Sequence, residues 1–127
     1  MIKTLEVHTD ERGDLFEMLR ADEIEKQIKQ INIIKVNPGF ERGDHYHEKK
    51  FEWFTVVQGS VELTLYNVKT KEKQIIELSD KKPQMISIVP NVHHKFKNNS
   101  NEIAVLVEAI DHTYNPQEED TFPLEIT

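Results

Sequence analysis

Residues 45–52 read His-Tyr-His-Glu-Lys-Lys-Phe-Glu, and this stretch decides how the rest of the chain is interpreted. In an extended strand successive side chains alternate between the two faces, so His45 and His47 point the same way. Glu52 lies an odd number of residues beyond His47, so we expect a turn at 48–51 to return its carboxylate to that face. Imidazoles and carboxylates are ligands that a borderline divalent metal prefers, and His94 is the candidate for a further ligand from elsewhere in the chain.

Composition limits the classes of protein that this chain can form. Its 127 residues and 37% hydrophobic content suit one domain with a modest core, so we expect residues 1–127 to form a single domain. The formal net charge of −7 argues against a nucleic-acid surface, which needs clustered Lys and Arg. The absence of cysteine excludes disulfides, thiolate metal sites and a cysteine nucleophile. No apolar run approaches the roughly 18 residues of a membrane span, and residues 1–6 lack the apolar core of a secretion signal, so we predict a soluble cytoplasmic protein.

Short alternating segments separated by turn residues recur along the chain, which predicts a mostly β protein with little helix. The expected strands are Ile31–Val36, Trp53–Val57, Val61–Tyr66, Ile75–Leu78, Met85–Val89 and Ile103–Val107. Their spacing is typical of a sandwich or barrel, and one short helix is expected at Ala21–Gln27. Ile103–Val107 is apolar on both faces, so we expect a second buried face, formed by a contact in a homodimer.

The spacing around the histidines resembles the first motif of the cupin superfamily. That motif consists of a glycine, two histidines separated by one residue, a glutamate and a second glycine, at fixed spacings. The matching residues here are Gly39, His45, His47, Glu52 and Gly59. The second motif is degenerate: Pro83, Val89 and Asn91 replace its glycine, proline and glycine, while His94 and Asn98 keep its His-x-x-x-Asn spacing. The resemblance implies an all-β jelly-roll barrel, the double-stranded β-helix of cupins. It also implies a divalent metal held by His45, His47, Glu52 and His94, with zinc favoured over iron, manganese or nickel.

A narrower resemblance extends over most of the chain. It is carried by Asp10-Glu11-Arg12-Gly13 with Glu17, by Pro38–His47, by Tyr114-Asn115-Pro116 and by Asp120-Thr121. These segments look like the C-terminal cupin domain of bifunctional capsular-polysaccharide enzymes that epimerise and then reduce UDP-linked 4-keto-6-deoxy sugars. More distant relatives are the dTDP-4-dehydrorhamnose 3,5-epimerases and the dTDP-sugar 3,4-ketoisomerases. All of these families move a proton next to a ketone, so the resemblance implies a nucleotide-diphosphate sugar as substrate and leaves room for a separate reductase partner.

His45 can serve as a metal ligand or as a base, but not as both. In the metal-free relatives a histidine base stands at the position of His45, while the second histidine and the glutamate are generally missing. A lone pair that binds a metal cannot also accept a proton, and the presence of Glu52 favours the role of ligand. The metal would then stabilise the enolate formed by proton removal. Such stabilisation of a developing charge typically contributes roughly several kcal/mol.

The base and the substrate contacts are assigned less directly. Candidates for the base are His93, Tyr46 and Tyr114, although regular strand alternation turns His93 and Tyr46 away from the proposed ligands. Candidates for substrate contacts are Arg12, Arg42, Lys95 and Lys97 for the diphosphate. Trp53, Phe51 or Phe96 could stack on the nucleotide base. The structural alternatives are a turn for Arg12, an ion pair for Arg42 and core or dimer packing for Trp53. His8 and His112 are isolated and are interpreted as surface or loop residues.

The sequence therefore favours an enzyme, a metal-dependent epimerase or isomerase of a nucleotide-linked 4-keto-6-deoxy sugar in bacterial surface polysaccharide synthesis. Two alternatives stay open. One is a non-catalytic sugar-binding or sensory cupin that keeps the barrel. The other is a metal-dependent dioxygenase, because the same ligands can hold iron with open positions.

Overall fold

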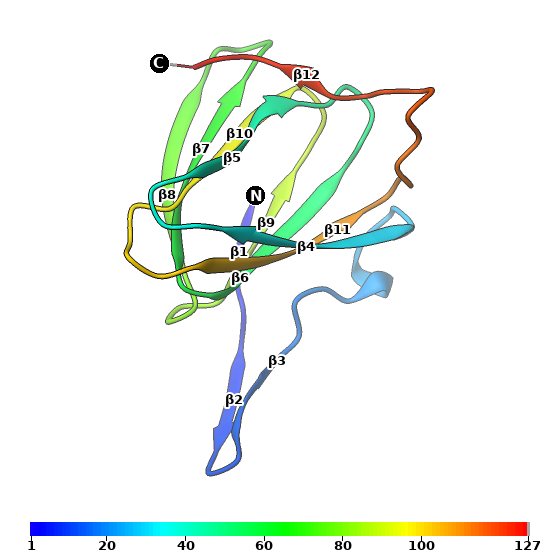
Figure 1. Cartoon of the computed structure of the whole chain (residues 1–127). Helices are drawn as coiled ribbons and strands as arrows, with labels where there is room; N and C mark the ends of the chain where they lie inside the picture. The colour runs from blue at the N-terminus through cyan, green and yellow to red at the C-terminus, as the bar shows by residue number, and fades with distance from the viewer. Residues whose placement is uncertain (127) are drawn as a thin grey trace.

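In the computed structural model, which describes residues 1–126, two five-stranded antiparallel sheets face each other across one core (Figure 1). The first sheet has the order β1 (Ile2–Thr4), β9 (Gln84–Ile88), β6 (Glu52–Gln58), β11 (Ala104–Ile110) and β4 (Gln30–Val36). The second has the order β12 (Phe122–Pro123), β5 (Glu41–Tyr46), β10 (Val92–Lys97), β7 (Ser60–Asn67) and β8 (Lys73–Ser79). A hairpin of β2 (Val7–Asp10) and β3 (Gly13–Phe16) projects away from the barrel. The prediction of an all-β jelly-roll barrel is confirmed.

The core between the sheets is built by the inward-facing residues of the strands. It comprises Val36, Phe54, Val56, Val61, Leu63, Leu78, Ile86, Ile88, Phe96, Ala104 and Leu106. The rings of Phe54 and Phe96 lie 4.8 Å apart, and burying a large apolar side chain of this kind contributes about 1.5–3 kcal/mol. His94 lies two residues before Phe96 on β10, so the alternation that buries Phe96 also carries His94 into the barrel.

A second apolar cluster covers the outer face of the first sheet. Trp53, Met85 and Ala109 form it together with side chains of segment 16–28, which lies across the sheet. The second buried face expected from the sequence is therefore supplied in part by the chain itself rather than by a dimer contact. Ile31 and Ile33 on the edge strand β4 stay exposed, with 63% and 62% of their surfaces accessible.

The helix predicted at Ala21–Gln27 is wrong, because only a single 3₁₀ turn, η1, forms at Ala21–Glu23. Ile24 is already extended, with φ −121° and ψ 150°, and it packs with Ile28 against the outer apolar cluster. A short helix is costly to nucleate, and here the apolar contacts are made by extended chain instead. Within residues 1–126, no helix has the length and apolar character that crossing a membrane requires.

Candidate functional site

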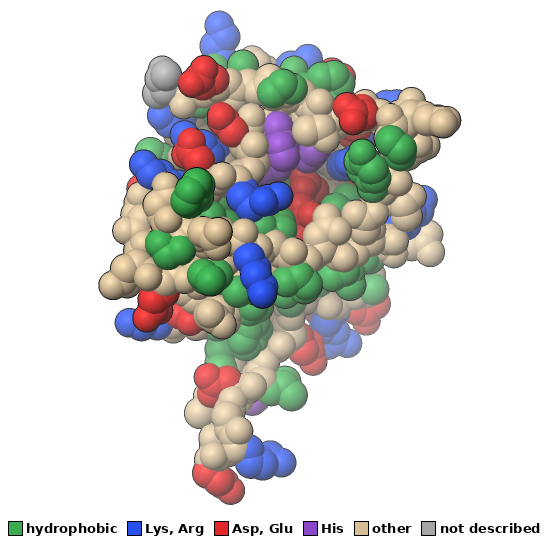
Figure 2. Space-filling view, in the orientation of Figure 1, with side chains coloured by type: hydrophobic (Ala, Val, Ile, Leu, Met, Phe, Trp, Pro, Cys, Tyr) green, Lys and Arg blue, Asp and Glu red, His purple; other side chains and the backbone are tan. Residues whose placement is uncertain are grey.

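The two sheets enclose a cavity of about 230 Å³. Its apolar lining consists of Ile34, Phe54, Phe96 and Ile110. Its polar side chains are Gln30, Asn32, Arg42, His45, His47, Lys50, Glu52, His94, Glu108, His112 and Tyr114. Figure 2 shows histidine, acidic and basic side chains gathered around this hollow. The cavity therefore combines apolar lining residues with many ionisable groups, which is typical of a binding site.

Three histidines, from β5, from the residue that follows it and from β10, converge in the cavity. His45 on β5 pairs in register with His94 on β10, and His47 follows two residues later. The centres of the three rings lie 4.8–5.3 Å apart, and the possible ligand atoms all lie within 4.8 Å of one another. His47 and His94 are buried, while His45 is half-buried at the cavity wall. The three nitrogens thus form a cluster of a size that could close on one metal ion.

Glu52 joins the histidines because the chain turns where the sequence predicts. β5 ends at Tyr46 and β6 begins at Glu52, so residues 47–51 reverse the chain. The Oε1 atom of Glu52 lies 2.9 Å from His47 Nε2 and 3.5 Å from His94 Nε2. This oxygen is buried and has no aligned hydrogen-bond donor within residues 1–126. A buried acceptor without a donor beside three imidazoles suits a cation, so the residues present fit the metal that the sequence predicts.

Burial disfavours the charged form of all four groups. Burial and then the neighbouring His47 lower the pKa of His45 to about 4. Burial is also the largest cause of the lowered pKa values of His47 and His94, and it raises the pKa of Glu52. The imidazoles are therefore neutral near pH 7 and offer lone pairs, while a bound cation would offset the cost of an ionised Glu52.

A second carboxyl group lies beside Glu52 and was missed by the sequence analysis. Glu108 on β11 is buried, and Asn32 Nδ2 donates a 2.7 Å hydrogen bond to its Oε1. Burial, followed by the hydrogen bond with Glu52, raises the pKa of Glu108 to about 9. Glu108 therefore carries a proton near neutral pH. Its signal was available, because it is the one acidic residue in the apolar strand Ala104–Ile110.

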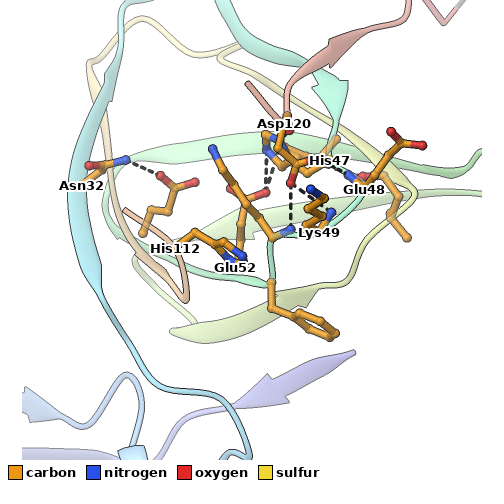
Figure 3. A network of polar contacts seen from close by, with 12 residues as sticks. Asn32, His47, Glu48, Lys49, Glu52, His112 and Asp120 are labelled. Carbon is orange, nitrogen blue, oxygen red and sulfur yellow. Dashed lines mark hydrogen bonds and ion pairs between the residues drawn. The ribbon is translucent and has the colours of Figure 1, made fainter. Parts of the chain in front are cut away.

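Asp120 of the C-terminal segment fixes the turn between the proposed ligands (Figure 3). Its carboxylate accepts hydrogen bonds from the backbone N–H groups of Glu48, Lys49 and Lys50 at 2.8, 3.0 and 3.0 Å. Although burial alone would raise it, these donors lower the pKa of Asp120. The Asp120 carbonyl oxygen also contacts His47 Nδ1. Because a carbonyl only accepts, Nδ1 carries the hydrogen and Nε2 presents its lone pair toward Glu52.

A bulge in β5 brings His45 opposite His94. Gly43 and Asp44 have φ values of 89° and 64°, and the register with β10 shifts between His94 and Lys95. A Cβ on Gly43 would lie 2.7 Å from the His94 carbonyl oxygen, so only glycine fits there. On the outer face, Asp44 Oδ1 lies 2.9 Å from His93 Nε2. His93 is buried but does not line the cavity, because it alternates with His94, so its predicted role as the base lacks the required placement.

Tyr46 and Lys95 also lie outside the cavity, for the same reason of strand alternation. Tyr46 stacks on Phe122 of β12, with ring centres 5.4 Å apart. Lys95 Nζ lies 3.8 Å from the Glu41 carboxylate. Neither side chain can contact a molecule in the cavity from these positions.

The other predicted contacts divide between the cavity and distant surfaces. Arg42 and Tyr114 line the cavity. Arg12 lies at the tip of the β2–β3 hairpin, where it pairs with Asp10, and Trp53 belongs to the outer apolar cluster. Within one chain, the hairpin position of Arg12 and the outward side of β6 therefore separate these two residues from the cavity.

His112, interpreted from the sequence as an isolated surface or loop residue, lines the cavity. Its Nδ1 atom lies 2.6 Å from Asp111 Oδ1. Lys50 lines the cavity as well. No motif marks either residue, because the contacts that place them join distant segments. His8, by contrast, lies on the exposed hairpin, as its sequence position suggested.

Comparisons with known proteins agree with this architecture. A protein family described as the polysaccharide biosynthesis C-terminal domain matches residues 8–122. The UDP-2-acetamido-2,6-beta-L-arabino-hexul-4-ose reductase of Pseudomonas aeruginosa is 27% identical over 116 residues, which are 91% of this chain and 30% of the reductase. The spore coat polysaccharide biosynthesis protein SpsL of Bacillus subtilis is 27% identical over 125 residues, which are 94% of this chain and 83% of SpsL. The chain thus spans less than a third of the reductase and most of SpsL.

Two solved structures show the same cupin fold. The 3,5-epimerase RmlC from Legionella pneumophila, in complex with dTDP-4-keto-L-rhamnose, has a TM-score of 0.83 and 22% identity, covering 97% of this chain and 71% of that one. The second is the sugar 3,4-ketoisomerase QdtA from Thermoanaerobacterium thermosaccharolyticum, in complex with TDP, with a TM-score of 0.79 and 24% identity. The match covers 96% of this chain and 85% of the QdtA chain. With its match to residues 8–122, this chain belongs to the polysaccharide biosynthesis C-terminal domain family.

Proposed function

We propose that this protein is an enzyme that moves a proton next to the ketone of a nucleotide-linked 4-keto-6-deoxy sugar, as an epimerase or ketoisomerase of bacterial surface polysaccharide synthesis. One observation carries the proposal: a single cavity holds three imidazoles and a buried carboxylate next to a polar wall. The family supports a role in polysaccharide synthesis. The fold shared with an epimerase and a ketoisomerase supports the class of reaction.

The proposed cofactor is a divalent metal, with zinc favoured and iron, manganese or nickel as alternatives. His45, His47, Glu52 and His94 would hold it, because their donor atoms meet in the cavity. When bound, the metal supplies Lewis acidity that favours the enolate form of a ketone. The histidines could bind the metal without first losing protons, because burial lowers their pKa values and keeps them neutral.

The remaining side chains of the cavity suit the other parts of the substrate. The cations Arg42 and Lys50 would pair with diphosphate oxygens, which guanidinium and ammonium groups bind well. Asn32, held by Gln30 at 3.0 Å, would donate to sugar hydroxyls together with Glu108. The rings of Phe54 and Phe96 would exclude water from the reacting carbons. Tyr114, which lines the cavity, would return a proton to the enolate.

The test is solvent exchange. The purified protein is incubated with UDP- and dTDP-linked 4-keto-6-deoxyhexoses in deuterated water, and the C3 and C5 protons of the sugar are followed by NMR. The expected result is exchange at one or both carbons that is lost after chelation and restored by metal. Absence of exchange in both series, with tight binding of the intact sugar, would make the protein a binding or sensory cupin. Oxygen consumption would instead indicate a dioxygenase.

A homodimer is part of the proposal. Ile31 and Ile33 expose apolar surface on the edge strand β4, and their neighbour Val107 on β11 is only partly buried. A second copy is the expected occupant, and Ile33→Glu should then shift the mass measured by light scattering from dimer to monomer. The product of the proposed reaction still carries a ketone, so a reductase is the class of enzyme that would consume it.

A further inference from the structure

We propose that His112, oriented by Asp111, is the base that takes the proton from the carbon next to the ketone. This inference rests on the function proposed above. The sequence gives no hint of it, because neither residue belongs to a motif.

Asp111 is a fixed acceptor. It follows the last residue of β11, is 7% exposed, and is tied to Phe51 in both directions. Its Oδ1 atom accepts a 2.9 Å hydrogen bond from the Phe51 N–H, and its own N–H donates to the Phe51 carbonyl at 3.3 Å. Phe51 directly precedes Glu52, so Asp111 is anchored to the same turn that presents a proposed metal ligand.

This acceptor sets the tautomer of His112. Nδ1 of His112 lies 2.6 Å from Asp111 Oδ1, and an ionised carboxylate only accepts hydrogen bonds. Nδ1 therefore carries the hydrogen, and Nε2 keeps the lone pair that a base needs. A carboxylate in this position also stabilises the imidazolium that forms when the ring takes up a proton.

The His112 ring lies at the wall of the cavity that holds the proposed metal ligands. His112 lines both the main cavity and the adjoining groove that is formed by segments 49–50 and 112–121. Its side chain is 44% exposed, so it reaches the cavity and solvent, with which it must exchange protons. The segment that follows is pinned to β4, because the Tyr114 N–H donates a 2.7 Å hydrogen bond to Gln30 Oε1. His112 is thus held between two anchored points.

The other ionisable side chains of the cavity suit the task less well. Outside the four proposed ligands they are Arg42, Lys50, Glu108 and Tyr114. Arginine, lysine and tyrosine side chains ordinarily hold their protons at neutral pH and lack a free basic site. Glu108 is engaged by Asn32 at 2.7 Å and lies against Glu52. Among the described residues that line the cavity, His112 is therefore the imidazole that lies outside the proposed metal cluster.

The step is balanced without any co-reactant. The bond between carbon and hydrogen next to the ketone breaks, and the proton forms a bond with Nε2 of His112. The electron pair becomes the carbon–carbon double bond of the enolate, and the negative charge moves to the ketone oxygen. A proton then returns to carbon, from His112 on the face that it left or from Tyr114 on the opposite face. In the second case His112 releases its proton to solvent and Tyr114 takes one up.

The test compares His112→Ala with His8→Ala, which removes an exposed histidine of the hairpin. In the metal-loaded protein we expect His112→Ala to lower kcat for deuterium exchange by about 10²–10⁴-fold, with KM and metal content retained. Added imidazole should restore exchange in His112→Ala and leave His8→Ala at the wild-type rate. Exchange at the wild-type rate in His112→Ala, or a loss that imidazole does not restore, would overturn the assignment. A wild-type protein without exchange would refute the proposed function itself.

A second readout needs no substrate. Long-range ¹H–¹⁵N spectra of the metal-free protein should show His112 protonated at Nδ1, with the resonance assigned by its loss in His112→Ala. Protonation at Nε2 would overturn the proposal, since the base would then have no lone pair toward the cavity.

Discussion

The backbone carbonyl of Asp120 accepts a hydrogen bond from Nδ1 of His47, 73 residues earlier in the chain. The carboxylate of the same residue holds the N–H groups of residues 48–50. One residue of the C-terminal segment therefore orients a proposed ligand and also shapes the turn that leads to Glu52. Such supporting contacts commonly decide how tightly a metal is held.

Removing the Asp120 side chain should loosen this turn. In Asp120→Ala we expect metal affinity to fall by about 10–100-fold and the free energy of unfolding to fall by about 1–3 kcal/mol, because three partly buried N–H groups lose their acceptor. Competition with a chromophoric zinc chelator and urea denaturation measure the two effects. The matched control is Asp80→Ala, which removes one exposed hydrogen bond to the Gly59 N–H. Equal affinities in the two variants would contradict the role of Asp120.

Removing a proposed ligand should abolish stabilisation by metal. We expect His47→Ala and Glu52→Ala to contain less metal by elemental analysis than the wild-type protein. At a free metal concentration of 100 times Kd, the wild-type protein should gain about 2.7 kcal/mol of stability, and both variants should lose this gain. Thermal unfolding with and without chelator measures it, with His8→Ala as the control. Unchanged metal stoichiometry in both variants would refute the ligand assignment.

Acid should destabilise the metal-free protein. The pKa of His45 falls to about 4 in the folded state, and burial lowers the pKa values of His47 and His94 in the same direction. Below the ordinary imidazole pKa of about 6.5, the histidines of the unfolded chain take up protons, whereas the buried histidines of the folded protein do not. The free energy of unfolding therefore falls as the pH falls from about 6.5 toward 4. Urea denaturation in the presence of chelator checks this. Constant stability across that range would contradict the buried, neutral state of the histidines.

Substitutions at Gly43 and Gly39 would distinguish the effect of backbone strain from that of a steric clash. Gly43 and Gly39 have similar φ values of 89° and 80°, but an added Cβ meets the His94 carbonyl oxygen only at Gly43. Strain from φ alone is of the order of 1–3 kcal/mol. We therefore expect Gly43→Ala to destabilise the protein more than Gly39→Ala and also to weaken metal binding, as measured by denaturation and chelator competition. Equal effects would mean that the bulge does not position His45.

Local patterns predicted much of this architecture. Apolar alternation identified six strands of the barrel, β4, β6, β7, β8, β9 and β11, but not β5 and β10, which are rich in polar and charged residues. Strand alternation also placed His45 and His47 on one face and predicted the turn that returns Glu52. The rule also warned that His93 and Tyr46 would face outward, which the structure bears out. The short helix failed because Ile24 and Ile28 gain more from packing as extended chain than one helical turn could provide.

Contacts between segments that are distant in the sequence could not be predicted. Asp111 contacts Phe51 across 60 residues, and the neighbouring His112, interpreted from the sequence as an isolated surface or loop residue, lines the cavity. The charged residue Glu108 within an apolar strand was a readable signal that its carboxyl group is buried. Family resemblance alone placed Arg12 near a substrate, and within one chain the hairpin carries it elsewhere.

The anchoring of the turn by Asp120 bears on how the protein matures. Contacts that close long loops form late, because the chain entropy lost in closing them is repaid only afterwards. A ribosome must therefore deliver the chain as far as Asp120 before His47 acquires its acceptor, and cellular metal should meet a folded barrel rather than a partly synthesised one.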